Sequence, residues 1–167
     1  TVVCVNLMDE ARRNGVSLDL DIISRRLGLP VVGVTARKHR GAEPLKKVLA
    51  NLDKYEFSPV NIRYPEPVEQ AISLIEPIVT AKQSRFNARW LAVRLLDCDT
   101  ALKDGLSKSL GNEFFGDPEL RLALARAKAL PGLRDLTGDE LGDMIAEGTV
   151  ATAHDICMGA VKRSKSH

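Results

Sequence analysis

A chain of 167 residues that is 44% hydrophobic and 28% charged is long enough to bury the core of one domain or of two small ones. Its net charge of +2, from 24 Lys and Arg against 22 Asp and Glu, argues against nucleic acid as a partner. No apolar stretch approaches the roughly 20 residues of a membrane span and no leader precedes Thr1, so we expect a chain that neither spans a membrane nor is addressed for export.

The first 60 residues predict alternating strands and helices. Two short β-branched runs, at 1–5 and 29–35, are typical of strands buried on both faces. Between them a helix is expected over 17–28, with Ser17 as its N-cap and Gly28 as its stop, and a second helix is expected over 41–52. This order predicts a parallel α/β unit. Because such sheets usually have about five or six strands, Thr1 looks like a cut within a doubly wound nucleotide-binding domain.

After a proline-punctuated linker, the pattern becomes helical and predicts no further strand. Amphipathic helices are expected over 66–82, 84–99, 100–110, 117–130 and 137–163. Pro77 is expected to kink or end the first of them early. Asp117 and the capping box of Thr137 with Glu140 mark the starts of the last two. Short connections between these helices predict a small bundle.

Two polar motifs follow the two predicted strands. Asn6-Leu7-Met8-Asp9 ends the first strand, and Thr35-Ala36-Arg37 ends the second. Because ligands bind at the carboxyl ends of the strands in such sheets, we expect the two motifs to share one edge and form a polar site there. The alternative for each is an ordinary strand end, followed by a helix cap or by a βα loop.

The pair resembles the base-recognition motifs of P-loop GTPases, N-K-x-D and S/T-A-K, in the right order and on the right elements. The resemblance implies that the carboxylate of Asp9 accepts hydrogen bonds from the guanine ring N–H and from the exocyclic amine, because only a carboxylate can accept both together. It implies that Asn6 binds the other edge of the ring and joins the two loops. The N–H of Ala36 would donate to the guanine carbonyl oxygen. Adenine would leave these groups unpaired.

The helical part sharpens the resemblance. An α/β end with Leu7 between Asn and Asp, followed by a linker and by RWLAVRLLDCD at 89–99, is similar to the cytosolic region of the ferrous-iron transport protein B family. That family joins a GTPase domain, through a helical regulatory domain, to a polytopic membrane domain that moves Fe²⁺. The fold expected is therefore α/β, a partial P-loop GTPase-type parallel sheet unit, followed by an all-α helical bundle, and mostly helical overall.

The resemblance implies domains and partners. It makes 1–58 the carboxyl-terminal part of a GTP-binding domain, 59–66 a linker, 67–163 a helical regulatory domain and 164–167 a basic tail. It implies GTP or GDP as cofactor at Asn6, Leu7, Asp9, Thr35, Ala36 and Arg37. It also implies a membrane domain of the same polypeptide as partner, Fe²⁺ as transported substrate not bound here, and a place at the cytoplasmic face of the bacterial inner membrane.

Two departures qualify the resemblance. Leu7 stands where general GTPases place a Lys that packs along the nucleotide, so fewer contacts and faster nucleotide release are expected. No G-x-x-x-x-G-K-[ST] sequence occurs in the chain, so the phosphates, Mg²⁺ and the attacking water would belong to a missing half, and this chain alone is not expected to hydrolyse GTP. The alternatives are a fragment of another small GTPase with an unrelated helical appendage, and a non-catalytic helical interaction module.

Other residue clusters favour structural roles. His154 and Cys157 are expected to pack on a helix face rather than bind metal, and the three cysteines have no paired spacing that suggests a disulfide framework. Trp90 and Phe86 are expected to anchor the core, with a domain contact as the alternative. Asp97 and Asp99 are expected to end one helix and cap the next, the loop at 37–40 to be solvated, and the tail to be frayed.

Overall fold

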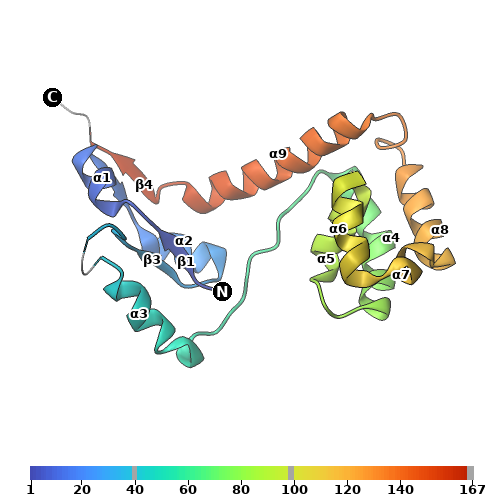
Figure 1. Ribbon diagram of the computed structural model, residues 1–167. Helices are drawn as coiled ribbons and strands as arrows, with labels where there is room; N and C mark the ends of the chain where they lie inside the picture. The colour runs from blue at the N-terminus through green and yellow to red at the C-terminus, as the bar shows by residue number, and fades with distance from the viewer. Residues whose placement is uncertain (39–40, 98–99, 165–167) are drawn as a thin grey trace. The chain divides into compact units, whose positions relative to one another are not determined.

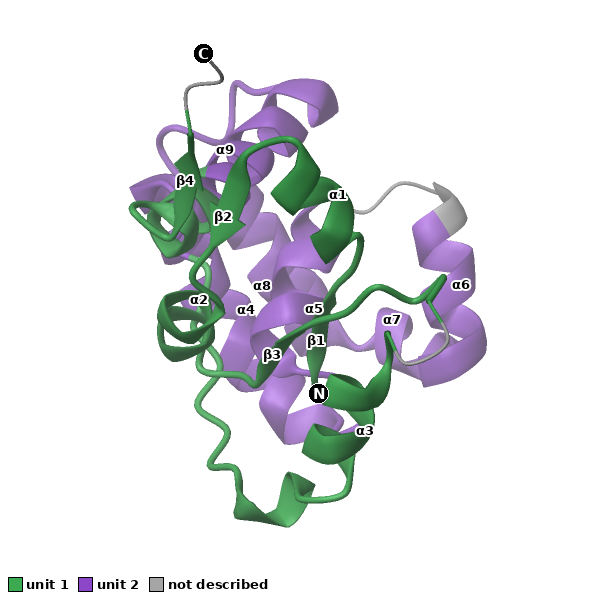
Figure 2. Ribbon diagram, turned by 90° about the vertical axis from the view of Figure 1, so that its left-hand side faces the viewer, with its two compact units in different colours: residues 1–62, 151–167 green, residues 63–150 purple. Residues whose placement is uncertain are grey.

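The computed structural model describes residues 1–38, 41–97 and 100–164. Its contacts divide the chain into two compact units, residues 1–62 with 151–167 (unit 1) and residues 63–150 (unit 2), which Figure 2 distinguishes by colour. Among the described residues, no helix is both long and apolar enough to cross a membrane.

Unit 1 is built on short strands with helices between them (Figure 1). Its elements are β1 (Val3–Val5), α1 (Met8–Arg13), β2 (Val16–Leu18), α2 (Leu20–Leu27), β3 (Val31–Gly33), α3 (Glu43–Leu49), a 3-10 turn η1 (Leu52–Lys54) and β4 (Val161–Arg163). Strands β1 and β3 pair in parallel, with Cys4 opposite Val32, as the strand and helix order predicted. Because the two strands are parallel, their carboxyl ends lie at the same edge of the sheet.

A second pair of strands was not predicted. Strand β2 pairs with β4 in antiparallel register, Ser17 opposite Lys162, so the expectation that no strand follows residue 60 is wrong. All three residues of β4 are exposed, and three residues are too few to give an alternating pattern. Ser17 is therefore a strand residue and not a helix cap.

The boundaries of α2 follow from its caps. Asp19, not Ser17, caps the helix, because its side chain accepts a hydrogen bond from the N–H of Ile22 at 3.0 Å. Gly28 ends it with a φ of 68°, as predicted. A Cβ at this glycine would lie 1.7 Å from the carbonyl oxygen of Ser58, so the chain leaving η1 packs directly against the end of α2.

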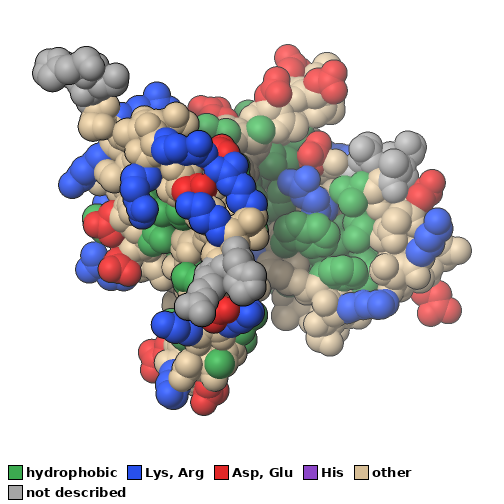
Figure 3. Space-filling view, turned by 60° about the vertical axis from the view of Figure 1, so that its left-hand side comes forward, with side chains coloured by type: hydrophobic (Ala, Val, Ile, Leu, Met, Phe, Trp, Pro, Cys, Tyr) green, Lys and Arg blue, Asp and Glu red, His purple; other side chains and the backbone are tan. Residues whose placement is uncertain are grey.

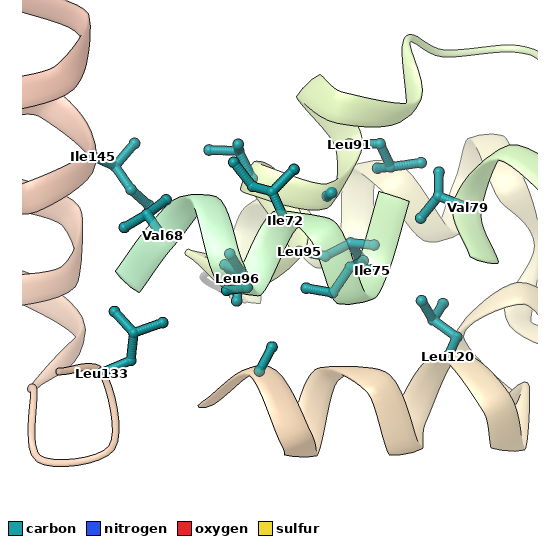
Figure 4. Close-up of a cluster of buried hydrophobic side chains, with 14 of the residues drawn as sticks. Val68, Ile72, Ile75, Val79, Leu91, Leu95, Leu96, Leu120, Leu133 and Ile145 are labelled. Atoms are coloured by element: carbon teal, nitrogen blue, oxygen red, sulfur yellow. The ribbon is translucent and has the colours of Figure 1, made fainter. Parts of the chain in front are cut away.

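Unit 2 is a helical bundle with a continuous apolar core. It contains α4 (Glu66–Lys82), α5 (Ala88–Leu96), α6 (Thr100–Leu110), α7 (Asn112–Gly116), α8 (Pro118–Lys128) and the first part of α9 (Gly138–Cys157), whose last residues belong to unit 1. Figure 4 shows side chains of α4, such as Ile72 and Ile75, lying among those of α5 and α8, such as Leu91 and Leu120. All four are at most 1% exposed. Burial of this kind contributes about 1.5–3 kcal/mol per side chain.

Pro77 does not break α4, which continues to Lys82. The expected early end is therefore wrong. Ile75 and Val79, on either side of the proline, are fully buried in the core. Their burial offsets the roughly 3 kcal/mol that an interior proline costs a helix.

The remaining helix starts follow local signals. Asp117 accepts a hydrogen bond from the N–H of Leu120 at 2.9 Å, and Thr137 and Glu140 form the predicted capping box, with the N–H of Thr137 donating to Glu140 at 2.8 Å. Helix α9 ends at Cys157, before a turn and β4, so the predicted helix to residue 163 is too long. Helix α7 was not predicted.

Trp90 is not a core anchor. Asn87 caps α5 by accepting a hydrogen bond from the N–H of Trp90 at 2.8 Å, and Trp90 is not among the buried residues of this helix. The Trp90 side chain is 45% exposed, whereas Phe86, whose ring lies 5.8 Å away, is partly buried against the core. The core side of α5 is formed by aliphatic residues, including Leu91 and Leu95.

Candidate functional site

The polar site begins where β1 turns into α1. Leu7 adopts left-handed backbone angles, φ 60° and ψ 33°, and is the one described residue other than glycine with a positive φ. This conformation costs a residue with a Cβ roughly 1 kcal/mol or more. It ends the strand sharply and places Asp9 and Glu10 in the first turn of α1. The Leu7 side chain is 44% exposed beside the site.

Asn6 joins the two predicted motifs. Its side-chain oxygen Oδ1 accepts hydrogen bonds from the N–H of Leu7 at 2.8 Å and from the N–H of Ala36 at 3.1 Å. The end of β1 is thereby tied to the loop that follows β3, and the two motifs lie together as their strand positions predicted. The N–H of Ala36, which the resemblance assigned to a guanine carbonyl, donates to Asn6 in this structure.

The loop after β3 is closed on itself. The N–H of Thr35 donates to the carbonyl oxygen of Gly41 at 3.1 Å, and the N–H of Lys38 donates back to the carbonyl oxygen of Thr35 at 2.9 Å. A Cβ at Gly41 would lie 1.7 Å from that Thr35 oxygen, so only glycine allows this approach. The role of Gly41 was not predicted from the sequence, although a glycine between a strand and a helix is a turn signal.

Asp9 is the charged centre of the site. Its side chain is 14% exposed, and its Oδ2 accepts from Nη2 of Arg37 at 2.8 Å, with Nζ of Lys38 at 3.5 Å. The hydrogen bond from Arg37 lowers the pKa of Asp9 below its ordinary value, and burial opposes this only in part. Asp9 therefore stays ionised at neutral pH. The same pairing raises the pKa of Arg37.

The guanidinium of Arg37 bridges two carboxylates. While Nη2 binds Asp9, Nη1 donates to Oε1 of Glu10 at 2.7 Å. Arg37 and Lys38 are exposed, as expected of a solvated loop, but both also pair with Asp9. The other two residues of that loop, 39 and 40, lie outside the described part of the chain. Glu10 was not predicted, because its role depends on a contact with a residue 27 positions away.

One oxygen of Asp9 has no hydrogen-bond partner. Its Oδ1 is shielded from solvent and finds no donor in the described part of the chain. Buried polar atoms are nearly always paired, and an orphan at a strand end marks a place where a ligand's donor fits. The adjacent hollow, of about 440 Å³, is lined by Asp9, Arg12, Arg13, Arg37 and Lys38. Lys and Arg side chains gather on this unit in Figure 3.

The other predicted clusters do not converge on the site. His154 and Cys157 are both exposed, so they do not pack on a helix face as expected. Within residues 1–38, 41–97 and 100–164, no three His, Cys, Asp or Glu side chains are grouped to hold a metal ion. Asp97 is the C-terminal cap residue of α5, while Cys98, Asp99 and the end of the basic tail lie outside the described residues.

Two family models match the chain. Residues 64–162 match the FeoB cytosolic helical domain, and residues 1–49 match ferrous iron transport protein B. The Fe(2+) transporter FeoB of Salmonella typhimurium is 27% identical over 153 residues, and that of Escherichia coli is 24% identical over 152 residues. Each match covers 84% of this chain and 19% of the relative, so the chain spans about a fifth of those proteins.

Solved structures share the fold. The cytosolic domain of Legionella pneumophila (L. pneumophila) FeoB superposes with a TM-score of 0.69 at 21% identity, covering 97% of this chain and 57% of that one. The GDP form I of the T. maritima FeoB cytosolic domain gives 0.63 at 22% identity, covering 96% and 56%. Because the helical-domain model alone matches more than half of the chain, the chain belongs to the FeoB ferrous iron transport family.

Proposed function

We propose that unit 1 holds the guanine-recognising part of a GTP-binding domain. The observation that carries the proposal is the 3.1 Å hydrogen bond from the Ala36 N–H to Asn6, which unites two strand-end motifs 30 residues apart beside an ionised Asp9. Strand ends of parallel sheets are the usual ligand positions. The relatives with this fold include cytosolic domains solved in GDP and GMPPNP forms.

The chemistry of the site favours guanine. Asp9, held ionised, accepts the ring N–H and the exocyclic amine of the base, and its unpaired Oδ1 supplies one of the two acceptors. Asn6 faces the other edge of the ring, and the N–H of Ala36 serves the carbonyl oxygen. Thr35 and Arg37 flank Ala36 in the sequence, and the side chain of Leu7 would lie along the base. Adenine leaves these groups unpaired, and the unpaired groups include the shielded Oδ1 of Asp9.

The phosphates and Mg²⁺ belong to residues that this chain does not contain. No G-x-x-x-x-G-K-[ST] sequence is present, and that loop is what cradles the phosphates and the metal ion in P-loop GTPases. We therefore propose that the chain by itself does not hydrolyse GTP. The proposed division is 1–58 for the nucleotide-binding part, 59–66 for a linker, 67–163 for a regulatory helical domain and 164–167 for a basic tail.

The whole protein is proposed to transport ferrous iron. The relatives are named Fe(2+) transporters, and the chain spans about a fifth of their length. A membrane domain of the same polypeptide would carry Fe²⁺, which is a substrate and not a ligand of this chain. The two units would act at the cytoplasmic face of the bacterial inner membrane, with the helical domain relaying nucleotide state. The helical-domain match speaks against another GTPase with an unrelated appendage.

One observation favours a second function, a helical interaction module. Trp90 is 45% exposed beside Phe86, and exposed aromatic side chains are common at protein contacts. In this alternative, unit 2 binds a partner and unit 1 has no nucleotide. The nucleotide test below separates the two functions.

The test is a titration of fluorescent GDP, competed with unlabelled GDP and ADP. It uses the full-length protein, or a version extended upstream by roughly one hundred residues to complete the sheet. We expect GDP to compete, ADP not to compete, and Asp9→Asn to lose most GDP binding. If the protein ignores both nucleotides, the nucleotide proposal fails and the helical-module function takes its place.

A further inference from the structure

We propose that Arg37 is an internal competitor for the guanine base: its guanidinium occupies the carboxylate of Asp9, so nucleotide binds only after Arg37 has left. This inference rests on the proposed function and adds a regulator to the same site. It assigns Arg37 the role of lowering guanine affinity. The nucleotide-binding motif alone gives the residue at this position no such role.

The donors of the two groups are alike. A guanidinium and a guanine edge are both planar and both present neighbouring N–H groups to a carboxylate. Nη2 of Arg37 lies 2.8 Å from Oδ2 of Asp9, which is one of the two oxygens that a guanine base needs. The other oxygen, Oδ1, is shielded from solvent. A base that uses both oxygens therefore has to displace the Arg37 contact.

The remaining groups of the site are also engaged. The N–H of Ala36 donates to Asn6, and Nζ of Lys38 lies 3.5 Å from Oδ2 of Asp9. Of the groups assigned to the base, the N–H of Ala36 and Oδ2 of Asp9 are each engaged within the chain, whereas Oδ1 of Asp9 is not. The site without nucleotide is thus closed by its own side chains.

The contact of Arg37 with Asp9 is weak enough for a nucleotide to displace it. Arg37 is 49% exposed, so water screens its contact with Asp9 from the guanidinium side, although Asp9 itself is 14% exposed. Exposed ion pairs contribute little, typically about 0.2–1 kcal/mol. After displacement from Asp9, the guanidinium keeps its second partner, Glu10, at the edge of the hollow. Arg37 therefore tunes affinity and does not abolish binding.

The test compares charge-matched variants of the full-length protein by fluorescent-GDP titration at low salt. Arg37→Gln is expected to lower the Kd for GDP about two- to fivefold. Arg12→Gln removes the same charge from the same hollow, and no ion pair of Arg12 occurs among the described residues. Because GDP is an anion, this control is expected to raise the Kd. A Kd that falls in Arg37→Gln and rises in Arg12→Gln distinguishes competition by Arg37 from a general electrostatic effect.

Two further arms make the result decisive. Arg37→Lys keeps the charge, but a single ammonium cannot bridge Asp9 and Glu10 in the same way, so it is expected to tighten GDP binding by a smaller factor. Raising the salt concentration is expected to narrow the difference between wild type and Arg37→Gln, because salt screens the exposed pair.

The outcomes distinguish this inference from the proposed function. If GDP binding depends on Asp9 but Arg37→Gln weakens it or leaves it unchanged, internal competition is overturned and guanine recognition stands. If neither wild type nor Arg37→Gln binds GDP, the proposed function fails, and the competition fails with it. Tighter binding in Arg37→Gln and not in Arg12→Gln supports both.

Discussion

The two units of the chain differ in how they are held together. Unit 2 closes a core of fully buried aliphatic side chains from several helices, such as Ile75 and Leu91. In unit 1, the described buried positions are Pro30, Val32, Val34 and Ala160. Its polar groups are held by hydrogen bonds and ion pairs between loops instead. The buried core is therefore concentrated in the helical bundle. The proposed nucleotide site lies on the α/β unit, which has few buried side chains.

The largest effect is expected in the core of unit 2. Leu91→Ala removes a fully buried side chain, which typically costs about 2–5 kcal/mol in unfolding free energy. Leu122→Ala, at a position that is 52% exposed, is the matched control and is expected to cost less than about 0.5 kcal/mol. Urea unfolding followed by circular dichroism measures both. Equal losses would show that the bundle does not depend on this core.

The variant Gly41→Ala is expected to destabilise unit 1 and leave the stability of unit 2 unchanged. Its Cβ would lie 1.7 Å from the carbonyl oxygen of Thr35, so the loop has to move at a cost of about 1–3 kcal/mol, confined to unit 1. GDP affinity is expected to fall with it. In Gly105→Ala nothing lies within 4 Å of the new Cβ in α6, and better helix propensity is expected to leave stability unchanged or slightly raised.

Amide hydrogen exchange resolves the Gly41→Ala effect by region. Faster exchange is expected in the strands and loops of unit 1, with protection in unit 2 retained. Equal loss of protection across both units would contradict their separate stability.

A smaller effect, with a pH signature, is expected at an ion pair of unit 2. Burial alone raises the pKa of Glu69, but the hydrogen bonds from Arg89, at 2.6 Å, and from the N–H of Tyr64 outweigh it and leave the pKa lowered. A lowered pKa in the folded state stabilises above the unfolded value, near about 4.3, and the contribution is lost as pH falls through the folded value.

The variant Glu69→Gln tests this sign. It is expected to cost about 1 kcal/mol at pH 7, and the deficit should shrink as pH falls below about 4. Urea unfolding of both proteins from pH 3 to pH 7 measures the difference. A deficit that stays constant over this range would mean that the charge of Glu69 contributes nothing.

The smallest effect is expected at Leu7, where the departure from the general GTPase motif lies. Leu7→Lys adds a stem that can lie along the base and is expected to slow GDP release about fourfold, the equivalent of one buried methylene or about 0.8 kcal/mol. Leu49→Lys, at an exposed position of α3, is the control. Stopped-flow release of fluorescent GDP measures both rates, and identical changes would remove Leu7 from the site.

Local signals predicted the parts of the fold that depend on neighbouring residues. The helix starts at Asp117 and Thr137, and the stop at Gly28, were readable because each cap acts within a few residues of itself. Strands β2 and β4 were not, because each gains its conformation from a partner far away in the chain. Trp90 was misassigned for a related reason: helical spacing gave it a face, but which face of α5 is buried depends on the helices packed against it.

The candidate site also has some features that the sequence predicted and others that it did not. Motif spacing placed Asn6 and Asp9 next to the loop of Ala36, because strand order fixes which ends meet. The pairing of Asp9 with Arg37 spans 28 residues and depends on side-chain conformation, so no sequence pattern announced it. The tight loop at Gly41 was also missed, although it joins residues only six positions apart.

The most direct test of guanine recognition exchanges the base and the residue together, in the full-length protein. Xanthine carries a carbonyl where guanine carries its amine, and an amide side chain donates to that carbonyl where a carboxylate cannot. Wild type is expected to prefer GDP over xanthosine diphosphate, and Asp9→Asn is expected to reverse that preference, with ADP bound by neither. An Asp9→Asn protein that keeps the wild-type preference would contradict the assignment of Asp9 to the base.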